Sequence, residues 1–274
     1  MDSGRMQVIG ICRFSYPAVG GFQVEHETPE EREAFLYDPA RLEQRFRYFE
    51  TFTLPAIQGQ SDPNFTFLIL IGQSLPARWR DRLMDGLSGV PQAIVRAAAP
   101  GPHRDVMKEA INSVREARDA PSLQFRLDDD DAVSLDFIAK LREAAQDCAG
   151  LITRNRHVAL DFTQGYVARP GPEGIAARQV SETLWTPALA MSSTPNSRTT
   201  IMNFGHTRMG RFMPVVSLTQ PDMFVRGHSD MNDSRQREDK RHFSLEKLDS
   251  DGEAYFRNRF GIDGTSVRAA FSPS

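Results

Sequence analysis

The sequence predicts an α/β fold, in which a mostly parallel sheet is flanked by helices and followed by an antiparallel extension. Two runs, "MQVIGIC" and "FTFLILI", are continuously apolar, as is typical of strands covered on both faces. Amphipathic stretches alternate with such runs to about residue 150, and short strand-like runs and turns follow. The 274 residues suffice for one large domain, so we expect a single unit with halves of about 6–150 and 151–274.

Four strands and four helices are expected in the first half. Each expected helix carries apolar residues at spacings of three and four along one face. We expect Pro55 to end the first helix and Ser134 to cap the last one. The expected strands are 6–12, 65–71, 92–98 and 122–127, and the expected helices are 39–53, 75–87, 104–119 and 134–149.

The order of these elements predicts where a ligand would bind. Strands joined by helical crossovers run parallel, and ligands bind at the carboxyl ends of such strands. The loop after Cys12 and the loop after Leu127 should therefore share one rim of the sheet.

The second half shows a different pattern of apolar and turn residues. Short apolar runs between residues 151 and 191 predict antiparallel hairpins, with a turn at 170–174 that is rich in proline and glycine. A charged segment begins at about Arg235, and a short helix is expected from Tyr255 to Phe260.

The composition excludes several classes of protein. A net charge of −3 and a pI near 6.1 give no general attraction to nucleic acid or to an anionic membrane. No stretch approaches the roughly 20 apolar residues of a transmembrane segment, and the N-terminal apolar run is too short for a signal peptide. The two cysteines, Cys12 and Cys148, lack a metal-binding spacing. We expect a soluble, cytoplasmic protein.

The run "RLDDDD", residues 126–131, is the feature that most clearly indicates chemistry. Neighbouring carboxylates raise one another's pKa unless a cation compensates their charge. Oxygen ligands of this kind suit Mg²⁺ or Mn²⁺, which complete their coordination with water and substrate phosphates. The alternative is a solvated acidic turn that stabilises the N-terminus of the following helix. The position after an apolar strand, on the expected ligand rim, favours the metal site.

Other modes of nucleotide binding and hydrolysis are excluded by their motifs. The sequence has no GxxxxGK[ST], no GxGxxG after the first strand, no GxSxG and no HExxH. The remaining explanation is a site that holds a nucleotide diphosphate through a metal and carboxylates.

Four segments resemble a known family. "RFSY", "LPAIQGQSDPNFTFLILIGQSLP", "RLDDDD" and "GHSDMNDSR" together are similar to the bacterial "putative rhamnosyltransferase" family of GT-A-type glycosyltransferases, over roughly residues 9–235. The resemblance implies a GT-A-like (Rossmann-like) sheet and transfer of a sugar, rhamnose by the family label, from a nucleotide diphosphate donor. The acceptor would be a polysaccharide, a glycan or a lipid-linked glycan.

The resemblance also implies roles for the aspartates. Asp128 matches the first carboxylate of the Asp-x-Asp motif, which meets the ribose or the metal, and Asp130 matches the second, which binds the metal. Asp131 is expected to assist through water, and Asp129 to lie on the donor side. Arg126 either faces the donor or pairs with one of these aspartates.

Further donor contacts are expected after the first two strands. Arg13, Phe14 and Ser15 follow the first strand, where this fold holds the base and diphosphate, although Phe14 fits a core role equally well. Related enzymes end the second strand with a carboxylate that reads a pyrimidine ring. Here the place reads "IGQS", so Gln73 or backbone groups would have to serve.

The second half supplies candidates for the metal and for the base. His228, after Gly227, is expected to bind the metal or a phosphate, and His206 is a further site candidate, although single histidines are often structural. Asp161 is the expected general base, with Glu182 as the alternative and a plain strand-end role as the competing explanation. Trp185 and Tyr166 fit either an acceptor sugar or the core.

Two other functions remain open at this point. One is a metal-dependent nucleotidyltransferase or a hydrolase of nucleotide diphosphates, and the other is a non-catalytic module that binds a nucleotide sugar.

Overall fold

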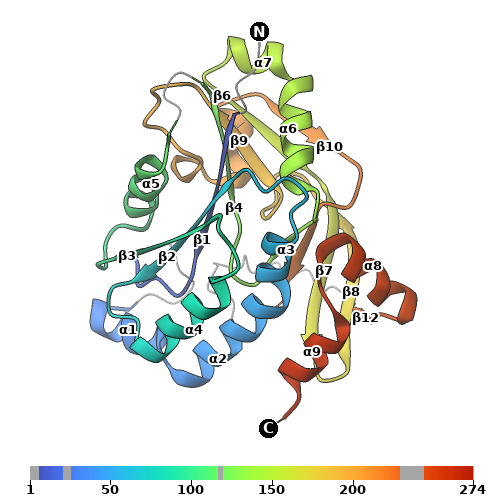
Figure 1. Cartoon of the computed structure of the whole chain (residues 1–274). Coiled ribbons are helices and arrows are strands. Elements are labelled where there is room, and N and C mark those ends of the chain that lie inside the picture. Colours follow the sequence, from blue (N-terminus) through green and yellow to red (C-terminus); the bar gives the residue numbers. More distant parts are fainter. Residues whose placement is uncertain (1–5, 21–25, 117–119, 229–243, 274) are drawn as a thin grey trace.

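A seven-stranded sheet forms the centre of the molecule (Figure 1). The computed structural model describes residues 6–20, 26–116, 120–228 and 244–273. The strand order is β10-β6-β9-β4-β1-β2-β3. The strands are β1 (Gln7–Arg13), β2 (Thr66–Gly72), β3 (Ala93–Ala98), β4 (Ser122–Arg126), β6 (His157–Phe162), β9 (Leu189–Ser193) and β10 (Val215–Leu218).

The central sheet is mostly parallel, as the sequence predicts. Strand β1 pairs in parallel with β2 and β4, β2 pairs in parallel with β3, and β10 pairs in parallel with β6. Strand β9 is antiparallel to both of its neighbours, β4 and β6. The carboxyl ends of β1, β2 and β4 therefore share one rim, where the expected loops lie.

Helices cover both faces of the sheet because its central strands are apolar on both. On the first face, Val8, Cys12 and Phe125 pack against helices from both ends of the sheet. These are α2 (Pro39–Tyr48), α3 (Leu54–Gln58), α4 (Ala77–Leu87), α6 (Phe137–Asp147) and α7 (Ala149–Arg154). On the second face, Ile9 and Ile11 pack against α5 (His103–Ser113) and the 3₁₀ helices η2 (Ile201–Asn203) and η3 (His206–Arg211).

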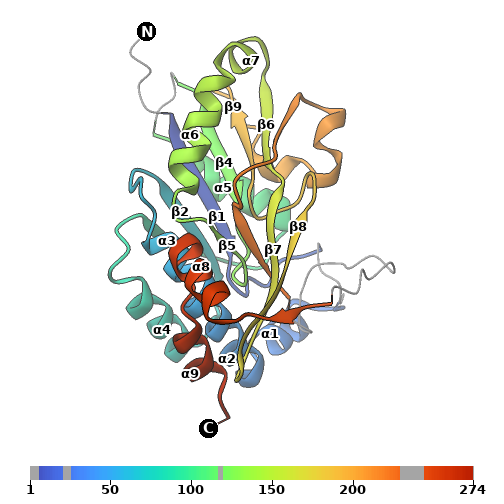
Figure 2. The same ribbon diagram turned by 90° about the vertical axis from the view of Figure 1, so that its right-hand side faces the viewer.

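A second sheet of five strands, in the order β12-β8-β7-β11-β5, lies beside the first. Helices α8 (Ser250–Phe260) and α9 (Gly264–Phe271) lie against it (Figure 2), and Phe256 and Phe260 pack in its core. Its strands are β5 (Ala132–Val133), β7 (Gln164–Gly171), β8 (Gly174–Ser181), β11 (Phe224–Gly227) and β12 (Glu246–Lys247). The predicted turn is present, and Gly174 adopts a φ of +110° that favours glycine.

The prediction that Pro55 ends the first helix is wrong. Helix α2 continues into a π-helical turn (η1, Phe49–Thr53) and then into α3, whose first turn contains Pro55. Proline lacks an N–H group and its ring crowds the carbonyl group four residues earlier. A wider turn before Pro55 accommodates this crowding, so the chain stays helical as far as Gln58.

Ser134 is not the cap of α6, because Asp136 is the residue that precedes the helix. Ser134 instead continues the β5 pairing: its N–H donates to Met223 O (2.9 Å) and its Oγ donates to Asp136 Oδ1 (2.7 Å). Helix α5 ends at Ser113, before the expected residue 119.

Three α-helices, α1 (Pro29–Leu36), α7 and α9, were not predicted, and α8 begins at Ser250 rather than at the expected Tyr255. Helix α1 is capped by Thr28 and α9 is capped by Asp263, so both had recognisable starts. The charged residues from Arg235 to 243 lie outside the described residues. None of the described helices combines the length and the apolar character needed to cross a membrane.

Candidate metal and nucleotide site

The aspartates form a tight turn at the carboxyl end of β4. The N–H of Asp131 donates to the carbonyl oxygen of Asp128 at 3.1 Å, and the chain then enters β5. Carboxylate oxygens of Asp128, Asp130 and Asp131 all lie within 4.8 Å of one another. Asp130 and Asp131 are buried, and Asp128 is partly exposed. Such a grouping offers the oxygen ligands that Mg²⁺ or Mn²⁺ requires.

Strand β11 and the helix before α3 hold this turn in place. Gly227 N donates to Asp131 Oδ1 (3.0 Å), and Thr53 Oγ1 donates to Asp131 O (2.7 Å). A Cβ atom at Gly227 would collide with the carbonyl oxygen of Asp130, so only glycine fits there. The close approach of β11 therefore fixes the backbone of both buried aspartates.

Asp129 points to a different partner. Its carboxylate, which is fully buried, forms a two-armed ion pair with Arg45 of α2, in which Arg45 Nε donates to Oδ2 at 2.9 Å and Nη2 contacts Oδ1. Arg45 Nη1 also lies 3.5 Å from Asp130 Oδ2. Donor contact by Asp129 stays a prediction, but its carboxylate is already engaged by Arg45.

Burial and mutual repulsion raise the pKa of Asp130 and Asp131 in the turn. Burial raises the pKa of Asp131 well above its usual range, and Asp130 and Asp128 raise it further. Burial also raises the pKa of Asp130, Arg45 opposes that shift, and Asp128 adds to it. A divalent cation among these three groups would stabilise their ionised forms, so the side chains present fit such an ion.

Arg13 and Arg126 lie on the second face of the central sheet. Ile9 and Ile11 of β1 face that side, so the alternation of β1 places Arg13 there. On β4, Gln124 Oε1 accepts a hydrogen bond from Ile201 N of η2 at 3.0 Å, which places Arg126 on the same face. Within the described residues, Arg126 Nε and Nη2 are shielded from solvent and have no hydrogen-bond partner. Among the described residues Arg126 forms no ion pair with an aspartate, although the charge of Asp128 opposes the lowering of its pKa by burial.

Two histidines begin the elements that cover this part of the sheet. Burial lowers the pKa of His206, the first residue of η3, to about 4, and Arg126 and Arg226 lower it further. Burial lowers the pKa of His103, the first residue of α5, to about 3, with Arg13 and Arg126 adding to the effect. Both imidazoles are therefore neutral at pH 7 and lie within the field of Arg126. The sequence indicated His206 but not His103.

The residues after β1 and β2 divide between the core and the rim. Phe14 is fully buried, and its ring centroid lies 4.8 Å from that of Phe46, which supports the core role. Ser15 adopts a φ of +46°, and its buried Oγ lacks a hydrogen-bond partner among the described residues. Gln73 is exposed at the end of β2, and its N–H donates to Ala98 O at 3.0 Å. Donor contact by these residues stays a prediction.

His228 follows the strand that holds the aspartate turn. Its N–H donates to Ala168 O (2.8 Å), and its carbonyl oxygen accepts from Tyr48 Oη (3.0 Å). Among the described residues, the carboxylate grouping at Asp128 does not include His228. Metal binding by His228 stays a prediction, and residues 229–235 of the quoted motif lie outside the described part of the chain.

Asp161 is fully buried and supports a loop of the second half. Its Oδ2 accepts from Leu184 N (2.8 Å) and from Ser217 Oγ (3.4 Å), and burial raises its pKa. Its role as a general base stays a prediction. Trp185, in this segment, carries the guanidinium carbon of Arg226 at 4.7 Å from its ring centroid.

Tyr166 belongs to the core of the second sheet. Its ring lies 5.1 Å from that of Phe256 and 6.0 Å from that of Tyr255, measured between centroids. These contacts support the core role over contact with an acceptor sugar.

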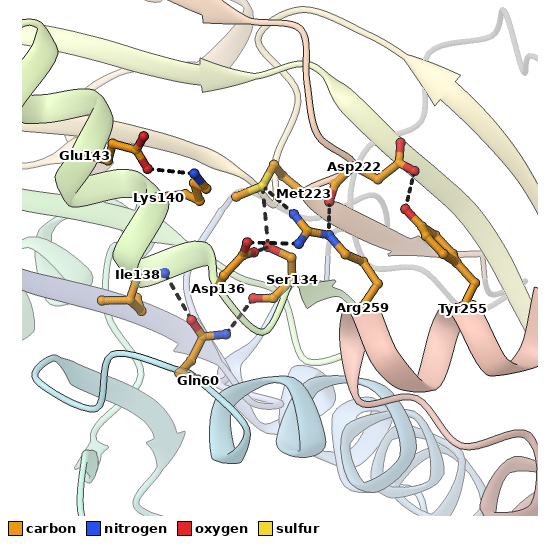
Figure 3. Close-up of polar contacts among 10 residues, drawn as sticks. All are labelled: Gln60, Ser134, Asp136, Ile138, Lys140, Glu143, Asp222, Met223, Tyr255 and Arg259. Carbon is orange, nitrogen blue, oxygen red and sulfur yellow. Dashed lines mark hydrogen bonds and ion pairs between the residues drawn. The ribbon is translucent and has the colours of Figure 1, made fainter.

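Arg259 of α8 links the segment that follows β5 to the segment that precedes β11 (Figure 3). Its Nη1 donates to Asp136 Oδ2 (2.9 Å), its Nε donates to Asp222 O (2.7 Å), and its Nη2 lies 3.2 Å from Met223 Sδ. Gln60 reaches the same segment from the other side and donates to Ser134 O at 2.7 Å. The network closes the end of the β5–β11 pair that lies away from the aspartates.

Sequence reasoning missed Arg45, Arg226 and Arg259. Each is an ordinary helix or strand arginine whose importance depends on a partner far away in the sequence. Local patterns carry no signal for such pairs.

Comparison with solved structures gives loose likenesses. TarS of S. aureus, residues 1–349 in complex with UDP, is 9% identical with a TM-score of 0.44, over 82% of this chain and 61% of that one. A putative glucose-1-phosphate thymidylyltransferase from Bacillus anthracis, in complex with a sucrose, is 9% identical with a TM-score of 0.35, over 80% of this chain and 88% of that one. The chain spans about three-fifths of the length of the TarS 1–349 structures it matches.

The sequence comparisons are more decisive. No curated protein sequence is significantly similar to this chain. A family described as "Putative rhamnosyl transferase" matches residues 7–241, which is most of the chain. The mixed α/β architecture that the resemblance implies is present. The chain therefore belongs to the family of glycosyltransferases described as "Putative rhamnosyl transferase".

Proposed function

We propose that this protein is a metal-dependent glycosyltransferase that takes a sugar from a nucleoside diphosphate donor. The grouping of Asp128, Asp130 and Asp131 at the carboxyl end of a central strand is the observation that carries the proposal. The family description favours rhamnose or a related deoxyhexose as the sugar. A polysaccharide, a glycan or a lipid-linked glycan would be the acceptor.

The carboxylates of Asp128, Asp130 and Asp131 would hold Mn²⁺ or Mg²⁺, with His228 as a further ligand. When bound, the ion supplies a Lewis acid that neutralises charge on the leaving diphosphate. Arg13 and Ser15 would contact the donor from the loop after β1, and Gln73 would contact it from the end of β2. The neutral imidazole of His206 would donate or accept a hydrogen bond at the same face.

A thermal-shift panel of UDP, dTDP and GDP, each with and without Mn²⁺, tests the proposal. A ligand that binds only the folded state raises Tm by mass action, by an amount that grows with the ratio of its concentration to Kd. We expect one diphosphate to raise Tm in the presence of Mn²⁺, and Asp130→Ala to abolish that shift. Asp85→Ala, which changes an exposed carboxylate on α4, is the matched control. Equal shifts in wild type and Asp130→Ala would contradict the metal site.

Product analysis separates the alternatives. Transfer of the sugar to an added glycan supports the transferase. Release of free sugar or sugar phosphate with every acceptor tried would favour a hydrolase or nucleotidyltransferase. Binding of an intact donor without turnover would favour a non-catalytic module.

A further inference from the structure

Arg126 is a partly buried cation that forms no ion pair within the described part of the chain; burial lowers its pKa, and the charge of Asp128 opposes that shift. Its Nε and Nη2 atoms are shielded from solvent and form no hydrogen bond. Burying a charged group without a partner costs stability, so folded proteins rarely keep one unless a ligand supplies the partner. Arg45, in the same site, shows the ordinary case, since Asp129 and Asp130 engage its guanidinium group.

The residues around Arg126 suit a ligand-binding site better than the hydrophobic core. Arg126 is the last residue of β4, pairs with Ile11 of β1, and precedes Asp128 by two positions. Arg126 lies on the face of the sheet that α5, η2 and η3 cover, and its charge lowers the pKa of His103 and of His206, which begin α5 and η3. These neutral imidazoles add hydrogen-bonding groups without adding a second positive charge.

The charges of the site leave the departing diphosphate in need of a further positive group, which the guanidinium of Arg126 can supply. Three carboxylates outweigh the charge of one divalent cation, so the metal group alone offers no excess positive charge to a departing diphosphate. A guanidinium group presents paired N–H donors that match two oxygens of a phosphate. Arg126 offers such donors, since its Nε and Nη2 have no hydrogen-bond partner among the described residues.

We propose that Arg126 binds the phosphates of the donor as a second cation beside the metal group. The inference rests on the function proposed above and adds the group that receives the leaving diphosphate. An acceptor phosphate would offer the same chemistry, and the experiment separates the two sources.

Inorganic pyrophosphate is the probe, because it carries the two phosphates without a base or a sugar. Titration calorimetry in EDTA removes the metal and leaves the protein cations to bind it. We expect wild type to bind pyrophosphate and Arg126→Met to bind it about ten- to a hundredfold more weakly, the cost of a lost charged hydrogen bond. Arg80→Met, which changes an exposed arginine on α4 at the other face of the sheet, should bind it as wild type does. Arg126→Lys keeps the charge but loses the paired N–H donors, so its affinity for pyrophosphate should lie between those of wild type and Arg126→Met.

Stability provides the second readout. Since Arg126 Nε and Nη2 form no hydrogen bond within the described residues, the Tm of Arg126→Met should equal or exceed that of wild type. A lower Tm would show that Arg126 serves the fold and would overturn the proposal, as would unchanged pyrophosphate binding by the variant or none by wild type. A nucleoside diphosphate should compete with pyrophosphate; simultaneous binding would assign Arg126 to the acceptor and overturn the donor assignment.

Failure of the proposed function and failure of the role of Arg126 give different results. If no nucleoside diphosphate binds wild type with Mn²⁺, the proposed function fails. If one binds with Mn²⁺ and loses affinity in Asp130→Ala but not in Arg126→Met, only the inference about Arg126 fails.

Discussion

Arg45 and Asp129 form a buried ion pair between α2 and the aspartate turn, with Nε and Oδ2 2.9 Å apart. This pair explains why four adjacent aspartates can coexist at one rim. One of them is neutralised from inside the protein, and the other three gather where a metal would lie. The pair also links the longest helical segment of the first half to the candidate site.

Removal of Arg45 should therefore destabilise the fold. Arg45→Met leaves Asp129 buried without its partner, and breaking a buried pair from one side costs about 3–5 kcal/mol. Urea denaturation measures the change in the free energy of unfolding. Arg47→Met, which breaks a half-exposed pair with Glu43 on the same helix, should cost only about 0–1 kcal/mol. Similar losses in both variants would show that the buried pair has no special role.

Gly227 should tolerate no side chain. In Gly227→Ala, the added methyl group collides with the backbone of Asp130, and overpacking of this kind costs about 1–3 kcal/mol. We expect a lower Tm and loss of the Mn²⁺-dependent nucleotide shift. Gly205→Ala is the control, because its Cβ would meet no atom within 4 Å and its φ of −72° suits alanine. Normal Mn²⁺-dependent binding by Gly227→Ala would mean that the turn adjusts without cost.

Arg259 should position the aspartate turn without touching the ligand. Arg259→Met removes its bonds to Asp136 and Asp222, so we expect Mn²⁺ to bind about tenfold more weakly, as for a loss of about 1.4 kcal/mol. Electron paramagnetic resonance of free Mn²⁺ measures this affinity. Arg257→Met, on the exposed side of the same helix, is the control. A drop in Tm with unchanged Mn²⁺ affinity would limit Arg259 to a structural role.

Asp161 allows a prediction about pH. Burial raises its pKa in the folded state, so its ionised form is disfavoured there, and the folded state loses stability as pH rises through that pKa. Asp161→Asn keeps an acceptor for Leu184 N and carries no charge. Its free energy of unfolding should equal or exceed that of wild type at pH 7, and the difference should shrink as pH falls towards 3.8, the ordinary pKa of the group.

The same variant tests the predicted base. If Asp161 only holds the segment at Leu184, Asp161→Asn retains sugar transfer, whereas loss of transfer with normal donor binding would support a catalytic role. Asp161→Ala removes the acceptor altogether and should destabilise the protein by about 1–3 kcal/mol.

The sequence by itself determined the strands and most helices of the first half. The apolar runs at residues 6–12 and 65–71 correspond to β1 and β2, because burial on both faces leaves no room for polar residues in these strands. The position of "RLDDDD" after β4 located the acidic turn on the ligand rim, since parallel strands end together. These are local or nearly local properties of the chain.

Only the tertiary structure decided which partner each aspartate contacts. Asp129 meets Arg45, which lies 84 positions earlier, and Asp131 meets Gly227, which lies 96 positions later. Arg259, from a C-terminal helix beyond the residues matched to the family, contacts Asp136 at the other end of the β5–β11 pair. Such contacts depend on how crossovers and the second sheet bring distant segments together, and the periodicity of the sequence carries no information about that choice.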